Sequence, residues 1–248
     1  MTITLAIGVK RMAARNAIIR RLPAVETLGT VGVICSDKTG TLTRNEMTVR
    51  SIHCGGRRIE LSGTGYHTHG GFQLAGKDHP PRDDPVLKQA LLAALLCNDT
   101  TLERCVAVPE QPCEGEWRVQ GDPMEGALVI AAMKAGLDPG EEAKRHPRTD
   151  LIPFESQHKF MATLHHSHTG EARIFVKGAP ERLLEMCNGQ LGLSGKEPLD
   201  AALWHVRMEE LATAGQRVLA VAAKPGLSHQ RDLEFADVES GLVLLGLF

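Results

Sequence analysis

Apolar runs that begin at a proline are the feature of this sequence that most limits its fold. Three such runs start at Pro85, Pro123 and Pro180, and each ends just before an Asn or a Gly. Proline favours the first turn of a helix, where its missing N–H needs no partner, and Asn or Gly favours the end. The runs predict helices over 85–97, 123–135 and 180–187, and a fourth is expected over 199–214.

Strands are expected between these helices. Short apolar and β-branched runs predict a hairpin with strands over 160–165 and 172–176, and further strands over 48–54, 57–61, 217–223 and 242–248. The segment 63–84 is rich in Gly, His, Pro and Asp and is predicted to be a loop. Hairpins mixed with separate helices favour an α+β domain over a doubly wound parallel sheet.

The first residues combine an apolar run, 1–9, with a segment, 10–21, that carries five basic residues and no acid. Nine helical residues cover about 13 Å, which is less than half of the ~30 Å hydrocarbon core of a bilayer. Two readings stay open. The segment is an amphipathic helix on a protein core, or it is the cytoplasmic end of a membrane helix with its arginines on the inner side.

Composition excludes one class of function. With 42% hydrophobic residues, 23% charged residues and a net charge of −2, the 248-residue chain has the apolar content of a soluble globular protein and no basic field for nucleic acid. The six cysteines show no metal-type pairing, so they are expected to be reduced thiols.

The stretch CSDKTGTLT, residues 35–43, follows an apolar run over 31–35 that is predicted to be a strand. Asp37 would then stand at the carboxyl end of this strand, where α/β sheets bind ligands. The N–H groups and Thr hydroxyls that follow can hold an anion, and Lys38 adds a positive charge. A carboxylate among such groups suits a nucleophile that becomes an aspartyl phosphate, with Mg²⁺ offsetting the repulsion between oxygens. An ordinary Asp–Thr turn is the alternative.

The longer stretch CSDKTGTLTRNEM resembles the phosphorylation motif of the P-type ATPases, and LPAVETLG before it resembles the type II cation pumps. The resemblance implies that Asp37 is phosphorylated, that Lys38 and Thr39 flank the phosphate, and that Asp37 and Thr39 hold Mg²⁺. Phosphatases of the related haloacid-dehalogenase type usually carry a second Asp where this chain has Thr39. Its absence favours a pump, because the phosphoenzyme is hydrolysed more slowly without this acid/base.

Two further motifs resemble the nucleotide-binding domain of the same family. IPFESQHKF implies that Phe154 stacks on adenine and that Lys159 lies beside the nucleotide. FVKGAPE implies that Lys177 lines the adenosine pocket and that Gly178 lets the nucleotide approach the backbone. Without the resemblance, Phe154 would be expected in the core, and KGAP would be an ordinary turn from strand to helix.

GDPMEGAL resembles the family segment in which Glu125 lies near the adenine amino group. A capping box, with Asp122 as N-cap and Glu125 bonding back to it, explains the same letters equally well. In AGQRVLAVA, Arg217 matches an arginine that reaches the nucleotide phosphates. At Glu155 and Ser156, this chain has no match for an arginine that some relatives carry.

A histidine cluster gives a weaker signal. His165, His166 and His168 could suggest a metal site, but they fall at a predicted hairpin tip without other ligands nearby in the sequence. A solvated turn is the favoured reading.

The resemblance covers nearly the whole chain and implies three parts. Residues 1–22 would be the cytoplasmic end of a membrane helix with a basic linker, and 23–46 the first segment of a haloacid-dehalogenase-like phosphorylation domain, including its first strand. Residues 47–248 would be a nucleotide-binding domain, with a mainly antiparallel sheet flanked by helices. The chain is thus expected to be a cytoplasmic piece of a cation-transporting ATPase in a membrane, with calcium as the first candidate ion. ATP, Mg²⁺ and the remaining pump domains are the expected partners.

Two alternatives remain. The chain could be a soluble aspartyl-phosphate phosphatase of the haloacid-dehalogenase type with a large cap, although Thr39 and the apolar, basic start argue against this. It could also act only as a nucleotide-binding module. That is the behaviour expected of the isolated polypeptide, which should bind nucleotide without turning it over.

Overall fold

The computed structural model describes residues 2–21, 24–38, 41–43, 46–105 and 117–248. Internal contacts divide the chain into two compact units, Met1–Asn45 and Glu46–Phe248. The first unit contains helix α1 (Thr2–Ala13) and the short helix α2 (Ala24–Leu28). None of the helices in the described ranges combines the length and the apolar composition that crossing a membrane requires.

The strand expected over 31–35 is not formed. These residues have neither helix nor strand, and the side chains of Val33 and Ile34 are exposed. A strand needs a neighbour for its backbone hydrogen bonds, and the described part of the first unit contains no other strand. The prediction that Asp37 stands at the tip of a buried strand is therefore wrong for this structure.

The second unit is built around a sheet. Its strands are β1 (Ser51–Cys54), β2 (Arg57–Leu61), β3 (Phe72–Leu74), β4 (Lys77–Asp78), β7 (Arg148–Glu155), β8 (Phe160–His166), β9 (Ala172–Gly178), β10 (Cys187–Gly192), β11 (Gly195–Pro198), β12 (Ala220–Pro225) and β13 (Leu242–Leu247). Among the described residues these eleven strands follow the order β4-β3-β2-β1-β13-β12-β9-β8-β7, with β10 paired to β13 and β11 to β10. Only the β10–β13 pairing is parallel in this part of the chain. The predicted mainly antiparallel sheet is confirmed.

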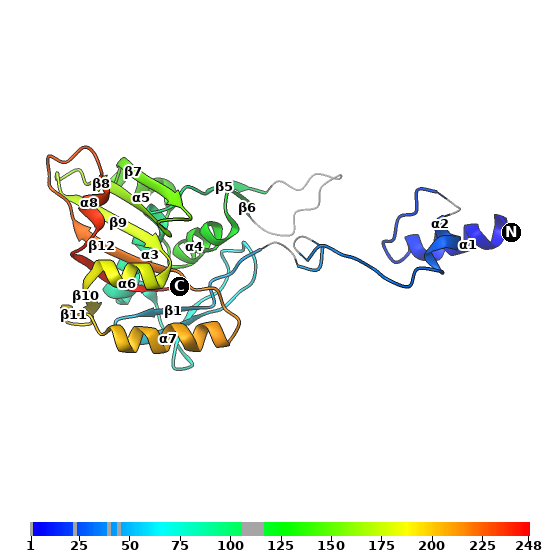
Figure 1. Cartoon of the computed structure of the whole chain (residues 1–248), viewed down its shortest axis with the longest axis horizontal. Helices are drawn as coiled ribbons and strands as arrows, with labels where there is room; N and C mark the ends of the chain where they lie inside the picture. Colours follow the sequence, from blue (N-terminus) through cyan, green and yellow to red (C-terminus); the bar gives the residue numbers. More distant parts are fainter. Residues whose placement is uncertain (1, 22–23, 39–40, 44–45, 106–116) are drawn as a thin grey trace. The chain divides into compact units, whose positions relative to one another are not determined.

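Helices cover both faces of this sheet (Figure 1). Helices α3 (Pro85–Leu96), α4 (Pro123–Lys134) and α5 (Pro139–Arg145) belong to one side, and α6 (Pro180–Met186), α7 (Ala201–Thr213) and α8 (Phe235–Val238) to the other. On β12, Val221 packs in the first core and Ala220 and Ala222 in the second, because successive side chains of a strand point to opposite faces. Strands β5 (Thr101–Arg104) and β6 (Trp117–Gln120) pair in a separate antiparallel sheet and come between α3 and α4 in the sequence.

The predicted helix starts are confirmed by their caps. The Asp84 carboxylate accepts the N–H of Leu87 at 3.1 Å at the start of α3, and Asp122 accepts the N–H of Met124 at 2.7 Å at the start of α4. These bonds satisfy N–H groups that have no partner within the helix.

The segment 63–84 is less irregular than predicted. It holds β3, β4 and a 3₁₀ turn over Pro81–Asp83. The side chain of Phe72 is buried. Its packing in the core stabilises a strand and outweighs the turn-forming propensity of the residues around it.

Two predictions about individual residue types are wrong for some of their residues: the solvated turn for His165 and His166, and the reduced thiol for Cys105. His165 and His166 are buried on β8, and only His168 lies in the exposed turn, because β8 extends one residue beyond the predicted strand.

Cysteine spacing does not reveal which thiols a fold brings within bonding distance. Cys105 is disulfide-bonded, whereas four cysteines are free and one lies outside the described residues: Cys35, Cys54, Cys97 and Cys187, and Cys113.

Candidate functional site

One end of the sheet gathers the ends of four neighbouring strands. Glu155 of β7 pairs with Phe160 of β8, Phe160 pairs with Gly178 of β9, and Gly178 pairs with Ala220 of β12. The residues that flank this line leave the sheet at the same edge. Segments distant in the sequence therefore meet there.

A cavity of about 590 Å³ lies at this edge. Its lining draws on α4, β7, β8, β9, α6 and α7 and on the segment that leads into β12. The lining includes all six residues that the sequence assigned to nucleotide binding: Glu125, Phe154, Lys159, Lys177, Gly178 and Arg217.

Phe154 is an exposed aromatic on the wall of this cavity. It belongs to β7, and 60% of its surface is accessible. The alternative reading of Phe154 as a core residue is therefore wrong. An accessible ring in a concave site can stack on a flat ligand.

Lys159 lies in the turn between β7 and β8 in a left-handed conformation, with φ at 60°. Its N–H donates to the carbonyl of Glu155 at 2.8 Å, and its carbonyl accepts the N–H of Ala179 at 2.9 Å. This conformation is unfavourable for a residue with a Cβ, and the two bonds hold it. Lys159 is exposed, and its side chain makes no hydrogen bond or ion pair within the described ranges.

Glu125 and Lys177 form an ion pair in the cavity wall. The Lys177 ammonium lies 2.6 Å from Glu125 Oε1, and the two side chains are 5% and 16% exposed, respectively. Glu125 Oε2 accepts the Thr100 hydroxyl at 3.1 Å and the N–H of Asp99 at 3.2 Å. Asp122 caps α4 without a reciprocal bond from Glu125 among the described residues, so the carboxylate faces the cavity network and the capping box is not formed.

Gly178 meets the neighbouring strand so closely that a side chain cannot be accommodated. A Cβ there would lie 2.7 Å from the Cα of Phe160 and would also collide with the carbonyl of Lys159. The packing against Phe160 and Lys159 therefore requires glycine at this position, whether or not a bound ligand requires it too.

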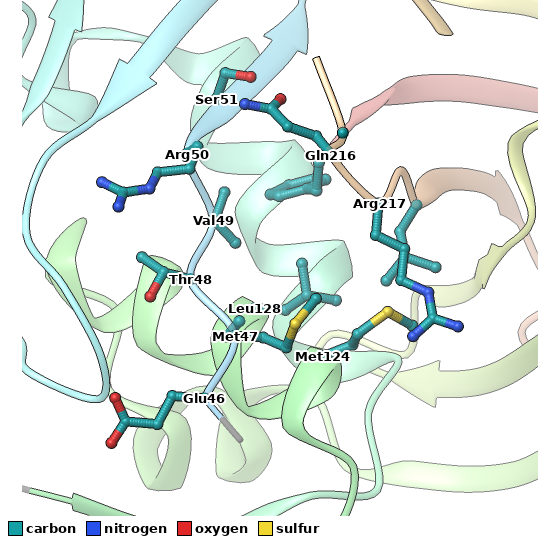
Figure 2. A pocket seen from close by; sticks show the side chains of 14 residues that line it. Glu46, Met47, Thr48, Val49, Arg50, Ser51, Met124, Leu128, Gln216 and Arg217 are labelled. Atoms are coloured by element: carbon teal, nitrogen blue, oxygen red, sulfur yellow. The ribbon is translucent and has the colours of Figure 1, made fainter. Parts of the chain in front are cut away.

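Arg217 precedes β12 and is exposed. A second cavity of about 330 Å³ adjoins the first and shares with it Met124, Gln216, Arg217 and Leu219. In Figure 2, Arg50 and Arg217 point to opposite sides of this second cavity. Arg217 is the one of the two arginines that also lines the larger cavity.

Residues 35–45 of the phosphorylation motif belong to the first unit, whereas Glu46 and Met47 belong to the second. Asp37 and Lys38 are exposed in a segment without helix or strand, and Thr39 lies outside the described residues. No group of three or more His, Cys, Asp or Glu side chains in the described ranges is arranged to hold a metal ion. Asp37 is the one carboxylate of the stretch 35–43, and it fits Mg²⁺ in the way the ion usually binds beside a nucleotide, through one or two carboxylates together with phosphates and water.

Sequence reasoning missed Asp99 and Thr100. They follow α3 directly, in the run Cys97-Asn98-Asp99-Thr100, and a cluster of polar residues after an apolar helix was the available signal. Both residues bond to Glu125, which is 25 residues further along the chain than Thr100. Only the fold brings Glu125 next to them.

Comparisons with known proteins agree on one family. Residues 86–248 match the family model described as P-type ATPase, cytoplasmic domain N. The whole chain is 46% identical to the cation-transporting ATPase pma1 of Synechocystis, covering 27% of that protein, and 42% identical to the probable cation-transporting ATPase F of Mycobacterium tuberculosis, covering 26%. It is 34% identical to a calcium-transporting ATPase of Bacillus subtilis, again over the whole chain and 27% of the relative. The chain spans about a quarter of the length of these relatives.

Proposed function

The chain belongs to the P-type ATPases, and from this membership we propose that it binds ATP in the 590 Å³ cavity at the end of the sheet. The observation that carries the proposal is the convergence of six residues from five segments on that one cavity. An exposed ring, an ion pair and two exposed cations are the groups that a nucleotide's base and phosphates require.

Five of these six residues have distinct roles in this proposal. Phe154 stacks on adenine, and its ring needs no reorganisation because it already stands in the cavity wall. Glu125 accepts the adenine amino group, while Lys177 lies beside the adenosine and holds Glu125 in place. Lys159 and Arg217, both exposed, neutralise the phosphates.

The wider proposal concerns the protein of which such a domain is part. It hydrolyses ATP through an aspartyl phosphate on Asp37, assisted by Lys38, Thr39 and Mg²⁺, and couples this to cation transport across a membrane. Residues 1–22 form the end of a membrane helix with its linker, 23–46 the first phosphorylation segment, and 47–248 the nucleotide-binding domain on the cytoplasmic side. Similarity to proteins named as cation-transporting and calcium-transporting ATPases supports this reading. Calcium is its first candidate ion, and the remaining pump domains are its partners.

Titration of the 248-residue chain with ATP, followed by NMR or calorimetry, tests nucleotide binding. We expect a dissociation constant near 1 mM, about −4 kcal/mol, because the site is open. Phe154→Ala should weaken binding roughly tenfold, in line with the ~1–3 kcal/mol of base–aromatic stacking.

Leu193→Ala is the matched control, since Leu193 is 62% exposed and does not line the cavity. Its affinity for ATP should equal that of the wild type. Absence of ATP binding, or equal affinities for Phe154→Ala and the wild type, would remove the cavity as the nucleotide site.

A further inference from the structure

A short polar turn after α3 is tied to the start of α4. The Asn98 side chain donates to the carbonyl of Glu125 at 3.0 Å, and its oxygen accepts the N–H of Thr100 at 2.9 Å. Arg148 of β7 lies 2.6 Å from the Asp99 carboxylate and fixes the other side of the turn. The turn is thus bound to two elements that both contribute to the nucleotide cavity.

Glycine allows Thr100 to come close to α4. A Cβ on Gly121 would lie 2.6 Å from the Thr100 hydroxyl oxygen, and Gly121 has φ at 130°. Because this position carries no side chain, the hydroxyl reaches Glu125 Oε2 at 3.1 Å and also lies 3.3 Å from the carbonyl of Asp122.

These contacts nearly saturate the Glu125 carboxylate. A carboxylate offers about four acceptor positions. Lys177 occupies one on Oε1, and Thr100 and the N–H of Asp99 occupy two on Oε2. The remaining position can accept an N–H but has no proton to donate. Because the three donors hold both oxygens, the carboxylate cannot rotate to avoid a lone pair of the ligand.

We propose that Thr100 is a positioning residue that makes the site prefer a 6-amino purine over a 6-oxo purine. The inference rests on the proposed ATP site and names its base specificity. The amino group of adenine donates to the remaining acceptor position of Glu125. The 6-oxygen of hypoxanthine or guanine presents a lone pair there, which leaves two acceptors facing each other without a proton. Without the Thr100 hydroxyl, the carboxylate can rotate and this penalty falls.

The test compares the affinities of the full chain for ATP and ITP. The base of ATP has a 6-amino group and an unprotonated N1, whereas the base of ITP has a 6-oxygen and a proton on N1. Thr100→Val removes the hydroxyl at nearly constant shape. We expect the ratio of ATP to ITP affinity to fall about three- to tenfold, the size of the effect of one ordinary hydrogen bond. Thr100→Ser should restore the ratio. Thr100→Ala provides a second hydroxyl-free variant in case the valine does not fold.

Thr101→Val is the matched control, because Thr101 is the exposed neighbour on β5 and does not line the cavity. It should keep the wild-type ratio. An unchanged ratio in both hydroxyl-free variants, or failure of serine to rescue, overturns the role of Thr100. If the wild type binds no ATP, or if Phe154→Ala binds ATP as the wild type does, the proposed function fails instead.

Discussion

Glu125 and Lys177 depend on each other unequally. If Lys177 is removed, Glu125 keeps the Thr100 hydroxyl and the Asp99 N–H as donors. If Glu125 is removed, the Lys177 ammonium keeps no hydrogen-bond acceptor among the described residues, and the Lys177 side chain is only 5% exposed. A buried charge without a partner is far more costly than a carboxylate that is still hydrogen-bonded.

Glu125→Ala should therefore lower the free energy of unfolding by about 3–5 kcal/mol. Lys177→Met should have a clearly smaller effect. Urea unfolding of both single variants and of the double variant measures this. The double variant should be more stable than Glu125→Ala alone, and equal losses for the two single variants would contradict the asymmetry.

Gly178 gives a second prediction for a single residue. Gly178→Ala should destabilise the fold by about 1–3 kcal/mol, the usual range for forcing an atom into a filled space, because the new methyl group meets β8. Gly71→Ala is the control, since a Cβ there meets nothing within 4 Å. Thermal melting should show a lower midpoint for the first variant and an unchanged one for the second.

The lining of the cavity could be predicted from motifs, but the links between its residues could not. Phe154 and Lys177 stand in recognisable local patterns, so a resemblance was enough to select them. The direction of the Glu125 side chain depends on Lys177, 52 residues away, and on Thr100. The same letters also fit a capping box, and only tertiary contacts decide between the two.

Helices of this fold were easier to predict than strands because their signals are local. Asp84 and Asp122 mark helix starts by contacts within three residues. The short strands β10 and β11 carry three glycines between them and no alternating apolar pattern. The parallel pairing of β10 with β13 joins residues more than fifty positions apart. Neither segment contains a local sequence pattern that predicts which strand it pairs with.

Asp84 holds three elements together, which leads to a prediction for α3. Besides capping α3, its buried carboxylate lies 2.7 Å from both Arg57 of β2 and His79 after β4. These hydrogen bonds lower the pKa of Asp84 against the opposing effect of burial, which is the largest single influence. Asp84→Ala should cost about 3–5 kcal/mol, because it removes the cap and leaves Arg57 without its partner.

The matched comparison is Asp138→Ala at α5. Asp138 caps its helix by the same bond, to the N–H of Glu141 at 2.9 Å, but it is exposed and has no ion pair in the described part of the chain. Urea unfolding should show a loss of only about 1 kcal/mol there. Equal losses at the two positions would mean that the ion pairs of Asp84 contribute nothing.

Two buried histidines make the stability of the whole second unit depend on pH. Burial lowers the pKa of His53 and of His165 from 6.5 to about 4. The unfolded chain therefore binds protons first, so both groups leave stability unaffected above about pH 6.5 and reduce it as pH falls from 6.5 towards 4. At about 1.4 kcal/mol per pKa unit, each contributes a loss on the order of 3 kcal/mol at the lower limit.

Urea unfolding at several pH values between 7.5 and 4.5 should show this decline. His53→Leu should have a shallower slope, because the leucine cannot take up a proton in either state. Asp84 should add a further loss only below its ordinary pKa of 3.8, since its folded pKa is lowered. The same slope for His53→Leu as for the wild type would show that His53 does not titrate in this range.

The first unit carries a prediction about catalysis. Asp37 is exposed in a segment without regular structure, and phosphoryl transfer depends on positioned groups whose orientation can be worth ~7–11 kcal/mol. We expect this polypeptide to form no hydroxylamine-sensitive phosphoenzyme from γ-labelled ATP and Mg²⁺. Stoichiometric label that is lost in Asp37→Asn would show instead that the chain is a competent catalyst.

The position of β13 has a consequence for how the protein is made. Although β13 comes last among the strands, it lies between β1 and β12 and also pairs with β10. The ribosome synthesises the chain from its amino end. One edge of β1 and one edge of β12 therefore remain unpaired until Leu242–Leu247 has left the ribosome. Open edges pair readily with other chains. Interruption of translation shortly before Leu242 would therefore release a sheet in two halves, a natural substrate for chaperones and proteases.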